Sequence, residues 1–176
     1  MKRWSELVVF AAILCGLANA EPQTQTSSQK ATPSISIGIT VSQSVVAAGT
    51  SVELHILVTN VSKGLIHMSR NNGKDSATLS FYTADLRDTK GSVPPETTFN
   101  RKLRGEVHST PENGGIITGS PIIFPLQPGE TLKDDMILND LFDLKVPGKY
   151  TVQIQHEDPV THNPVKSNII TLTITP

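Results

Sequence analysis

Four residues near the end of the chain carry side chains that could hold a divalent metal ion. His156, Glu157, Asp158 and His162 fall in one segment between two expected strands. Imidazole nitrogens and carboxylate oxygens are ligands that zinc and related ions accept in proteins. Their spacing matches no established ligand motif, however, and a solvated hairpin loop has the same composition. The sequence therefore names these four residues as metal candidates and predicts no cofactor.

An acidic group is the second candidate for chemistry. It consists of Asp134, Asp135, Asp140 and Asp143. Calcium needs about six or more oxygen ligands that converge from a compact loop. Asp134 and Asp135 are neighbours in an expected strand, so their side chains point to opposite faces. We therefore do not expect a calcium site here.

A basic group is the third candidate. Arg101, Lys102 and Arg104 lie in segment 96–119, which has few apolar anchors and is expected to be a long loop. These cations could meet an acidic partner or a polysaccharide, or they could simply be solvated. No aromatic residues alternate with them as stacking platforms, and the net charge of −1 gives no reason to expect nucleic acid. The segment is predicted as a partner-binding loop.

Motifs for nucleophilic catalysis are missing from the sequence. It contains no Gly-x-Ser-x-Gly elbow and no glycine-rich phosphate loop. His55, His67 and His108 are isolated, and His55 falls on the polar face of an expected strand, so solvent exposure is expected for all three. The single cysteine, Cys15, lies in the N-terminal segment. We expect a protein that is not an enzyme.

The N-terminus is typical of a secretory signal peptide. Lys2 and Arg3 precede an apolar run over residues 7–17, and Ala18-Asn19-Ala20 provides a cleavage signal. Residues 1–20 are predicted to be removed on export to the periplasm or the cell exterior, which leaves no stable membrane anchor. An uncleaved anchor is the alternative. Lipidation of Cys15 is disfavoured, because Leu14 stands where a lipoprotein signal needs a small residue.

A polar linker and a β-rich domain follow. Residues 21–33 lack large apolar side chains and are predicted to be flexible, whereas apolar and polar residues alternate from residue 34 onward. The clearest expected strands are Ile35–Val41, Val52–Thr59, Ala77–Thr83, Leu132–Leu138, Tyr150–Gln155 and Ser167–Thr175. Seven to eight strands at intervals near ten residues predict an immunoglobulin-like antiparallel β-sandwich over residues 34–176. A jelly roll or small barrel is the alternative, and no segment shows a helical period.

Turn residues give finer expectations. Pro147-Gly148 predicts a turn, after which the Tyr150 hydroxyl should bind a backbone group just upstream, as in the tyrosine corner of sandwich domains. Residues 140–143 predict one helical turn. Asn60-Val61-Ser62 predicts a turn and is also a glycosylation sequon.

These turns carry a resemblance to known families. Asn60-Val61-Ser62, Pro128-Gly129-Glu130 and Pro147 to Val152 resemble bacterial secreted immunoglobulin-like modules. They also resemble, more loosely, the BsuPI family of intracellular proteinase inhibitors from Bacillus. The resemblance covers most of residues 35–174. It implies a sandwich fold, and the second family implies inhibition of a protease.

Three functions follow as hypotheses. The first is a secreted, non-enzymatic interaction or structural module that binds a protein or glycan through its loops. The second is a proteinase inhibitor that uses the proline-flanked segment 93–111. The third is a metal-dependent accessory domain of a hydrolase, with its ion near His156 and His162. The absence of catalytic motifs favours the first.

Overall fold

A computed structural model describes residues 32–71, 81–108 and 121–176 of the chain. All of them belong to one compact unit, Ala31–Pro176. The predicted signal peptide and all but two residues of the predicted linker therefore lie outside the described residues, and both stay predictions. Within the described part of the chain, no helix has the length and apolar character needed to cross a membrane.

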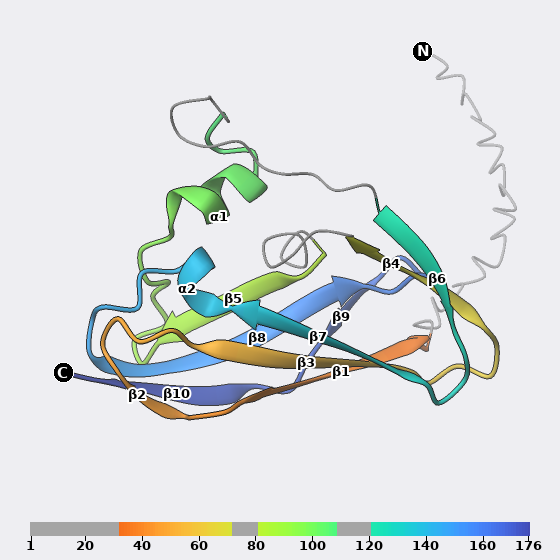
Figure 1. Ribbon diagram of the computed structural model, residues 1–176, viewed down its shortest axis with the longest axis horizontal. Coiled ribbons are helices and arrows are strands. Elements are labelled where there is room, and N and C mark those ends of the chain that lie inside the picture. The colour runs from red at the N-terminus through yellow and green to blue at the C-terminus, as the bar shows by residue number, and fades with distance from the viewer. Residues whose placement is uncertain (1–31, 72–80, 109–120) are drawn as a thin grey trace, which may run out of the picture. The chain divides into compact units, whose positions relative to one another are not determined.

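The described residues form ten strands and two short helices (Figure 1). The strands are β1 (Ile35–Val41), β2 (Val45–Ala47), β3 (Glu53–Asn60), β4 (Ile66–Asn71), β5 (Thr83–Asp88), β6 (Pro121–Leu126), β7 (Thr131–Ile137), β8 (Gly148–Glu157), β9 (Pro164–Lys166) and β10 (Ile170–Thr175). The helices are α1 (Thr98–Leu103) and α2 (Leu138–Leu141). This count exceeds the expected seven to eight strands. Two of the ten, β2 and β9, have only three residues each and were too short to be predicted from alternation.

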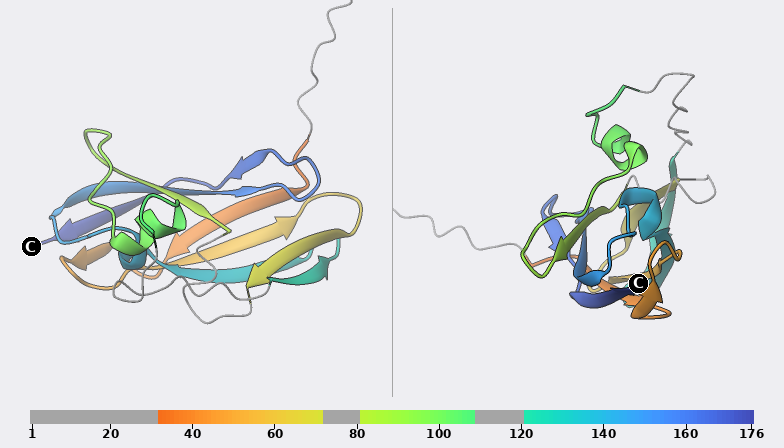
Figure 2. Two further views of the ribbon diagram at one scale, coloured as in Figure 1. Left: turned by 90° about the horizontal axis from the view of Figure 1, so that it is seen from above. Right: turned by 90° about the vertical axis from the view of Figure 1, so that its left-hand side faces the viewer.

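Two main sheets form the sandwich. Sheet A has the order β1-β3-β7, and sheet B has the order β2-β10-β8-β5, with β9 also paired to β8 (Figures 1 and 2). Strands β4 and β6 form a separate two-stranded ribbon. All pairs are antiparallel except β2 with β10. The first two strands of the domain join different sheets, since β1 pairs with β3 in sheet A and β2 pairs with β10 in sheet B. This confirms the immunoglobulin-like antiparallel β-sandwich.

Alternating apolar residues fill the space between the sheets. Leu54, Ile56 and Val58 of β3 are fully buried, as are Val152 of β8 and Leu172 of β10. The intervening residues of these strands face outward, with the period of two that the sequence predicts. The outer faces are therefore polar, and the core rests on burial of β-branched and leucine side chains.

The tyrosine corner is present, but its turn lies slightly upstream of the predicted one. The Tyr150 hydroxyl donates a hydrogen bond of 2.8 Å to the Val146 carbonyl oxygen. Burial, and then the nearby negative charge of Asp88, raise the pKa of this phenol. The turn occupies residues 144–146, and Gly148 already belongs to β8 with no positive φ. The Tyr150 ring lies 3.6 Å from where a Cβ of residue 148 would stand, which is an ordinary van der Waals distance.

Three expectations for local structure need correction. Of the strand expected over 77–83, residues 77–80 lie outside the described residues, Phe81 and Tyr82 are not in a strand, and Thr83 is the first residue of β5. In β5, Ala84 and Leu86 face inward but alternate with charged residues, so the sequence shows no clear apolar pattern there. Segment 96–119 contains helix α1, which is too short to show a helical period and is capped by the Thr97 hydroxyl. The helical turn expected over 140–143 is α2, which starts two residues earlier, at Leu138.

Candidate functional site

A trough lies along strands β5, β8 and β9 of sheet B and borders Arg104, one of the predicted site residues. Thr83 and Asp85 of β5 lie opposite Gln155 and Gln153 of β8, so four polar side chains stand in two cross-strand pairs. Lys166 of β9 lies opposite Gln155 on its other side. This part of the trough has a volume of about 290 Å³. Strand pairing therefore holds hydrogen-bond donors and acceptors along an open, rigid surface.

A second hollow lies at the β8–β9 hairpin. It has a volume of about 260 Å³, shares Thr83 and Gln155 with the first, and is also lined by His156 and His162. At the opposite end, Arg104 lines the first hollow. Residues of the predicted basic group and of the predicted metal group thus border two hollows with shared lining residues, although the chain separates them by some fifty positions. The sequence did not predict this relation, because strand order was unknown.

The predicted metal group itself does not converge on one point. His162 Nδ1 lies 2.7 Å from a Glu157 carboxylate oxygen, whereas His156 Nδ1 lies 2.5 Å from the Glu157 backbone carbonyl oxygen. Asp158 is fully buried, with both carboxylate oxygens engaged in hydrogen bonds. Metal binding by this group stays a prediction, but Asp158 is already occupied with holding the fold.

Asp158 fastens the hairpin to the start of the domain. Its carboxylate accepts hydrogen bonds from the Ser34 hydroxyl and from the backbone N–H groups of Ser34, Ile35, Val160 and Thr161. Burial by itself would raise the pKa of Asp158, but hydrogen bonds from Thr161, Val160 and Ser34 outweigh it and lower the pKa to about 2. The ionised carboxylate is therefore the form that the folded protein needs.

The predicted basic group is internally neutralised. Arg104 pairs with Glu96 and with Glu106, and Arg101 lies 3.7 Å from Glu106. Lys102 is buried rather than solvated. These residues lie in and just after α1 rather than in an extended loop. The cations therefore stabilise this segment, and only Arg104 also faces the trough.

Asn60 acts as a turn residue. Its side-chain amide donates hydrogen bonds to the carbonyl oxygens of Gly64 and Leu126, and its side-chain oxygen accepts hydrogen bonds from Ser62. The residue is 1% exposed. A sugar on this nitrogen would replace one of the two donated hydrogen bonds at a buried position, and the hydrogen bonds confirm Asn60 as a turn residue.

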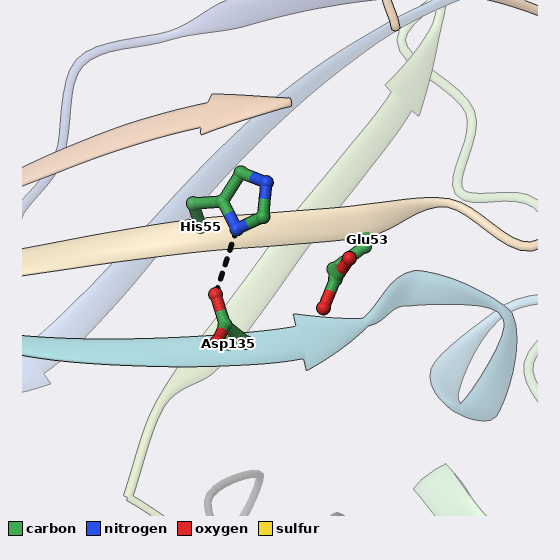
Figure 3. A group of neighbouring side chains, drawn as sticks. All are labelled: Glu53, His55 and Asp135. Atoms are coloured by element: carbon green, nitrogen blue, oxygen red, sulfur yellow. Dashed lines mark hydrogen bonds and ion pairs between the residues drawn. The ribbon is translucent and has the colours of Figure 1, made fainter. Parts of the chain in front are cut away.

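The acidic group separates as expected at its first two members. Asp134 points into the core, where it accepts a hydrogen bond of 2.7 Å from the Tyr82 hydroxyl. Asp135 points outward from sheet A and meets His55, which lies directly opposite on β3 (Figure 3). The exposure expected for His55 therefore holds only in part, because its ring is engaged on both sides.

His55 is the centre of a polar cluster that sequence reasoning missed. Its Nδ1 lies 2.7 Å from Asp135 Oδ1, and its Nε2 lies 2.8 Å from the Ser42 hydroxyl. Glu53 stands two residues away on the same face of β3, and the ligand atoms of Glu53, His55 and Asp135 all lie within 4.8 Å of one another (Figure 3). Among residues 32–71, 81–108 and 121–176, no other three histidine, cysteine or acidic side chains approach so closely.

Ser42, His55 and Asp135 have the hydrogen-bond order of a hydrolase triad, but the surroundings differ. The side chains of His55 and Asp135 are 38% and 62% exposed. In a triad the acid is buried, and a dry site with aligned donors stabilises the oxyanion. Ser42 is exposed in the bend after β1, so its hydroxyl is hydrated and gains little from the adjacent imidazole. The geometry does not favour nucleophilic catalysis.

Comparisons with known proteins add little beyond the fold. No family model and no curated protein matches the sequence. The CARDB domain of the PF1109 protein from Pyrococcus furiosus, in complex with di-metal ions, is similar at 9% identity and a TM-score of 0.43, covering 81% of this chain and 89% of that one. A beta-glucosidase from Listeria innocua, in complex with glucose, has 11% identity, a TM-score of 0.36 and coverage of 81% and 16%. BslA, a bacterial hydrophobin, is similar at 12% identity and a TM-score of 0.34, and the match covers 81% of this chain and 96% of that one.

Similarity at these identities and TM-scores carries no argument about ligands or partners. The resemblance to BsuPI inhibitors also stays a prediction.

Proposed function

We propose that this chain is an exported, non-enzymatic binding module that holds a glycan in the trough of sheet B. The observation that carries the proposal is the set of paired polar side chains along β5, β8 and β9. Asp85 offers acceptors, Lys166 offers donors, and Gln155 offers both. These groups suit a ligand that is rich in hydroxyl groups.

The lining of the trough favours a glycan over a protein partner. Protein interfaces have a core of apolar and aromatic anchors inside a polar rim. Val93 is the one large and well-exposed apolar side chain that lines the trough. Other exposed apolar residues, such as Ile123 and Ile169, do not line it. A partner protein would find no buried anchor there.

The inhibitor hypothesis receives no comparable support. Of segment 93–111, residues 93–108 are described, and they include helix α1. An inhibitory loop must present an extended backbone to a protease cleft. Here Glu96 and Arg104 instead tie the two sides of the segment together.

Affinity electrophoresis tests the proposal. The chain from Glu21 onward would run through gels that contain soluble neutral or acidic polysaccharides, with bovine serum albumin as a reference. We expect one polysaccharide to retard the wild type, and the double variant Gln155→Ala/Lys166→Ala to lose the retardation. Thr171→Ala, an exposed change on sheet B outside the trough, is the matched control. Retardation by none of the polysaccharides, or equal retardation of all three proteins, would contradict the proposal.

A further inference from the structure

The cluster of Glu53, His55 and Asp135 lies on sheet A and is independent of the trough. His55 and Asp135 are directly opposite across the β3–β7 pair, while Glu53 is diagonal to Asp135. Residues of one strand that are two positions apart share a face, so all three side chains leave the sheet on the same side. Because β3 is the central strand of sheet A, His55 is paired with β1 and with β7, and Glu53 is paired with Ile137 of β7.

Cross-strand pairing alone accounts for only part of the cluster. A histidine opposite an aspartate is an ordinary surface pair. Glu53 adds a second carboxylate within 4.8 Å of the first, and like charges at this distance repel. A divalent cation would remove this repulsion and give both carboxylates a shared partner.

From this geometry we infer that Glu53, His55 and Asp135 bind a divalent transition-metal ion of the zinc class. One imidazole nitrogen and two carboxylate oxygens match the ligand types of such ions, and water would complete the coordination. In a tetrahedral zinc site the ligand atoms lie about 3.3 Å apart, given metal–ligand distances of about 2.0–2.2 Å. His55 Nδ1 and Asp135 Oδ1 need to separate slightly from 2.7 Å, and exposed side chains permit this by rotation.

Ser42 supports the same assignment from the other side of the ring. A metal-bound histidine usually donates its second ring N–H to an oxygen, which fixes the tautomer. With the ion on Nδ1, His55 carries its proton on Nε2 and donates it to the Ser42 hydroxyl, 2.8 Å away. Ser42 is then a positioning residue, and the ion replaces the hydrogen bond between His55 and Asp135.

The hairpin provides a matched control within the same molecule. His162 also has Nδ1 at 2.7 Å from a carboxylate oxygen, that of Glu157, and its side chain is also exposed. No third histidine, cysteine or acidic ligand joins that pair within the described residues. If one histidine–carboxylate pair sufficed for zinc binding, the two sites would behave alike.

Isothermal titration of the chain from Glu21 onward with zinc chloride tests the inference. We expect one ion per chain at micromolar affinity. His55→Ala and Glu53→Gln should each weaken binding at least tenfold, and Ser42→Ala should weaken it less than either. His162→Ala should change the affinity less than twofold. Unchanged affinity in His55→Ala and Glu53→Gln, or loss of binding in His162→Ala, would overturn the assignment. Circular dichroism of each variant would show that the fold is retained.

Discussion

The β8–β9 hairpin and the outer face of sheet A both hold a histidine next to a carboxylate, yet they differ in what surrounds the pair. In the hairpin, His162 meets Glu157, and the remaining acid, Asp158, turns inward to fasten the fold. On sheet A, His55 meets Asp135, and Glu53 approaches from the same face. In the hairpin, the histidine pairs with a carboxylate five positions away, and the third acid is committed to hydrogen bonds with the start of the domain. On sheet A, pairing between distant strands brings three possible ligands together.

The two aspartates show why the regions should respond differently to mutation. Asp158 is fully buried and accepts five hydrogen bonds, so the folded state depends on it. Asp135 is 62% exposed at its side chain, and water replaces its partner at little cost. Stability should therefore depend on the first residue and metal affinity on the second.

The largest expected effect is that of Asp158→Ala. Removing the carboxylate leaves several backbone N–H groups near β1 and the hairpin without their acceptor, and each buried unsatisfied donor costs about 1–3 kcal/mol. We expect the free energy of unfolding to fall by roughly 3 kcal/mol, as measured by urea denaturation. Asp135→Ala is the matched control and should change stability by less than about 1 kcal/mol. Equal effects of the two substitutions would remove the distinction between the regions.

Lowering the pH should show the same dependence of stability on the Asp158 carboxylate, without removal of the side chain. The pKa of Asp158 is lowered to about 2 in the folded state, against about 3.9 for an unfolded aspartate. Its stabilisation is therefore complete above pH 4 and is lost as the pH falls toward 2, which amounts to roughly 2 kcal/mol. In urea titrations at a series of pH values, Asp158→Asn should lack this component of the acid destabilisation. An unchanged slope between pH 4 and 2 would contradict the role of the ionised carboxylate.

A smaller loss is expected at the tyrosine corner. Tyr150→Phe removes the hydrogen bond to the Val146 carbonyl oxygen while it keeps the buried ring. We expect a loss of about 1 kcal/mol in the free energy of unfolding. Thr151→Val, at the exposed neighbouring position, is a control that should leave stability nearly unchanged. If Tyr150→Phe left the free energy of unfolding unchanged, this polar contact, unlike that of Asp158, would be dispensable for stability.

The smallest effect on stability is expected within the sheet A cluster. His55→Ala removes a solvent-exposed pair, so the melting temperature without metal should shift by only a few degrees. Wild type should gain thermal stability when zinc is added, because a ligand that binds only the folded state shifts the unfolding equilibrium. His55→Ala should not gain it. A zinc-dependent gain in His55→Ala equal to that of the wild type would place the ion elsewhere.

Local patterns predicted the fold well. The alternation over Ile35–Val41 and Val52–Thr59 identified two core strands, and Tyr150 identified the corner. The part of β5 after Thr83 was missed because its inward residues, Ala84 and Leu86, alternate with charged residues. Helix α1 was missed because its stability depends on the Thr97 cap and on packing rather than on a long apolar stripe.

The candidate sites could not be predicted in the same way. His55 and Asp135 are 80 positions apart and meet only through the register of β3 with β7. A sequence shows which residues face outward from a strand, but it does not show which strands are neighbours. The Glu53-x-His55 spacing was the one local signal, since it places two ligand types on one face of an expected strand. The trough of sheet B likewise depends on strand order.

Nuclear magnetic resonance of the five histidine rings during a zinc titration would test the comparison most directly. With the chain from Glu21 onward labelled with nitrogen-15, the ring signals of His55 should shift or broaden first and saturate at one ion per chain. Its Nδ1 signal should move toward that of a metal-bound nitrogen while Nε2 retains its proton. Earlier or larger changes at His156 or His162 would contradict the account and return the metal site to the hairpin.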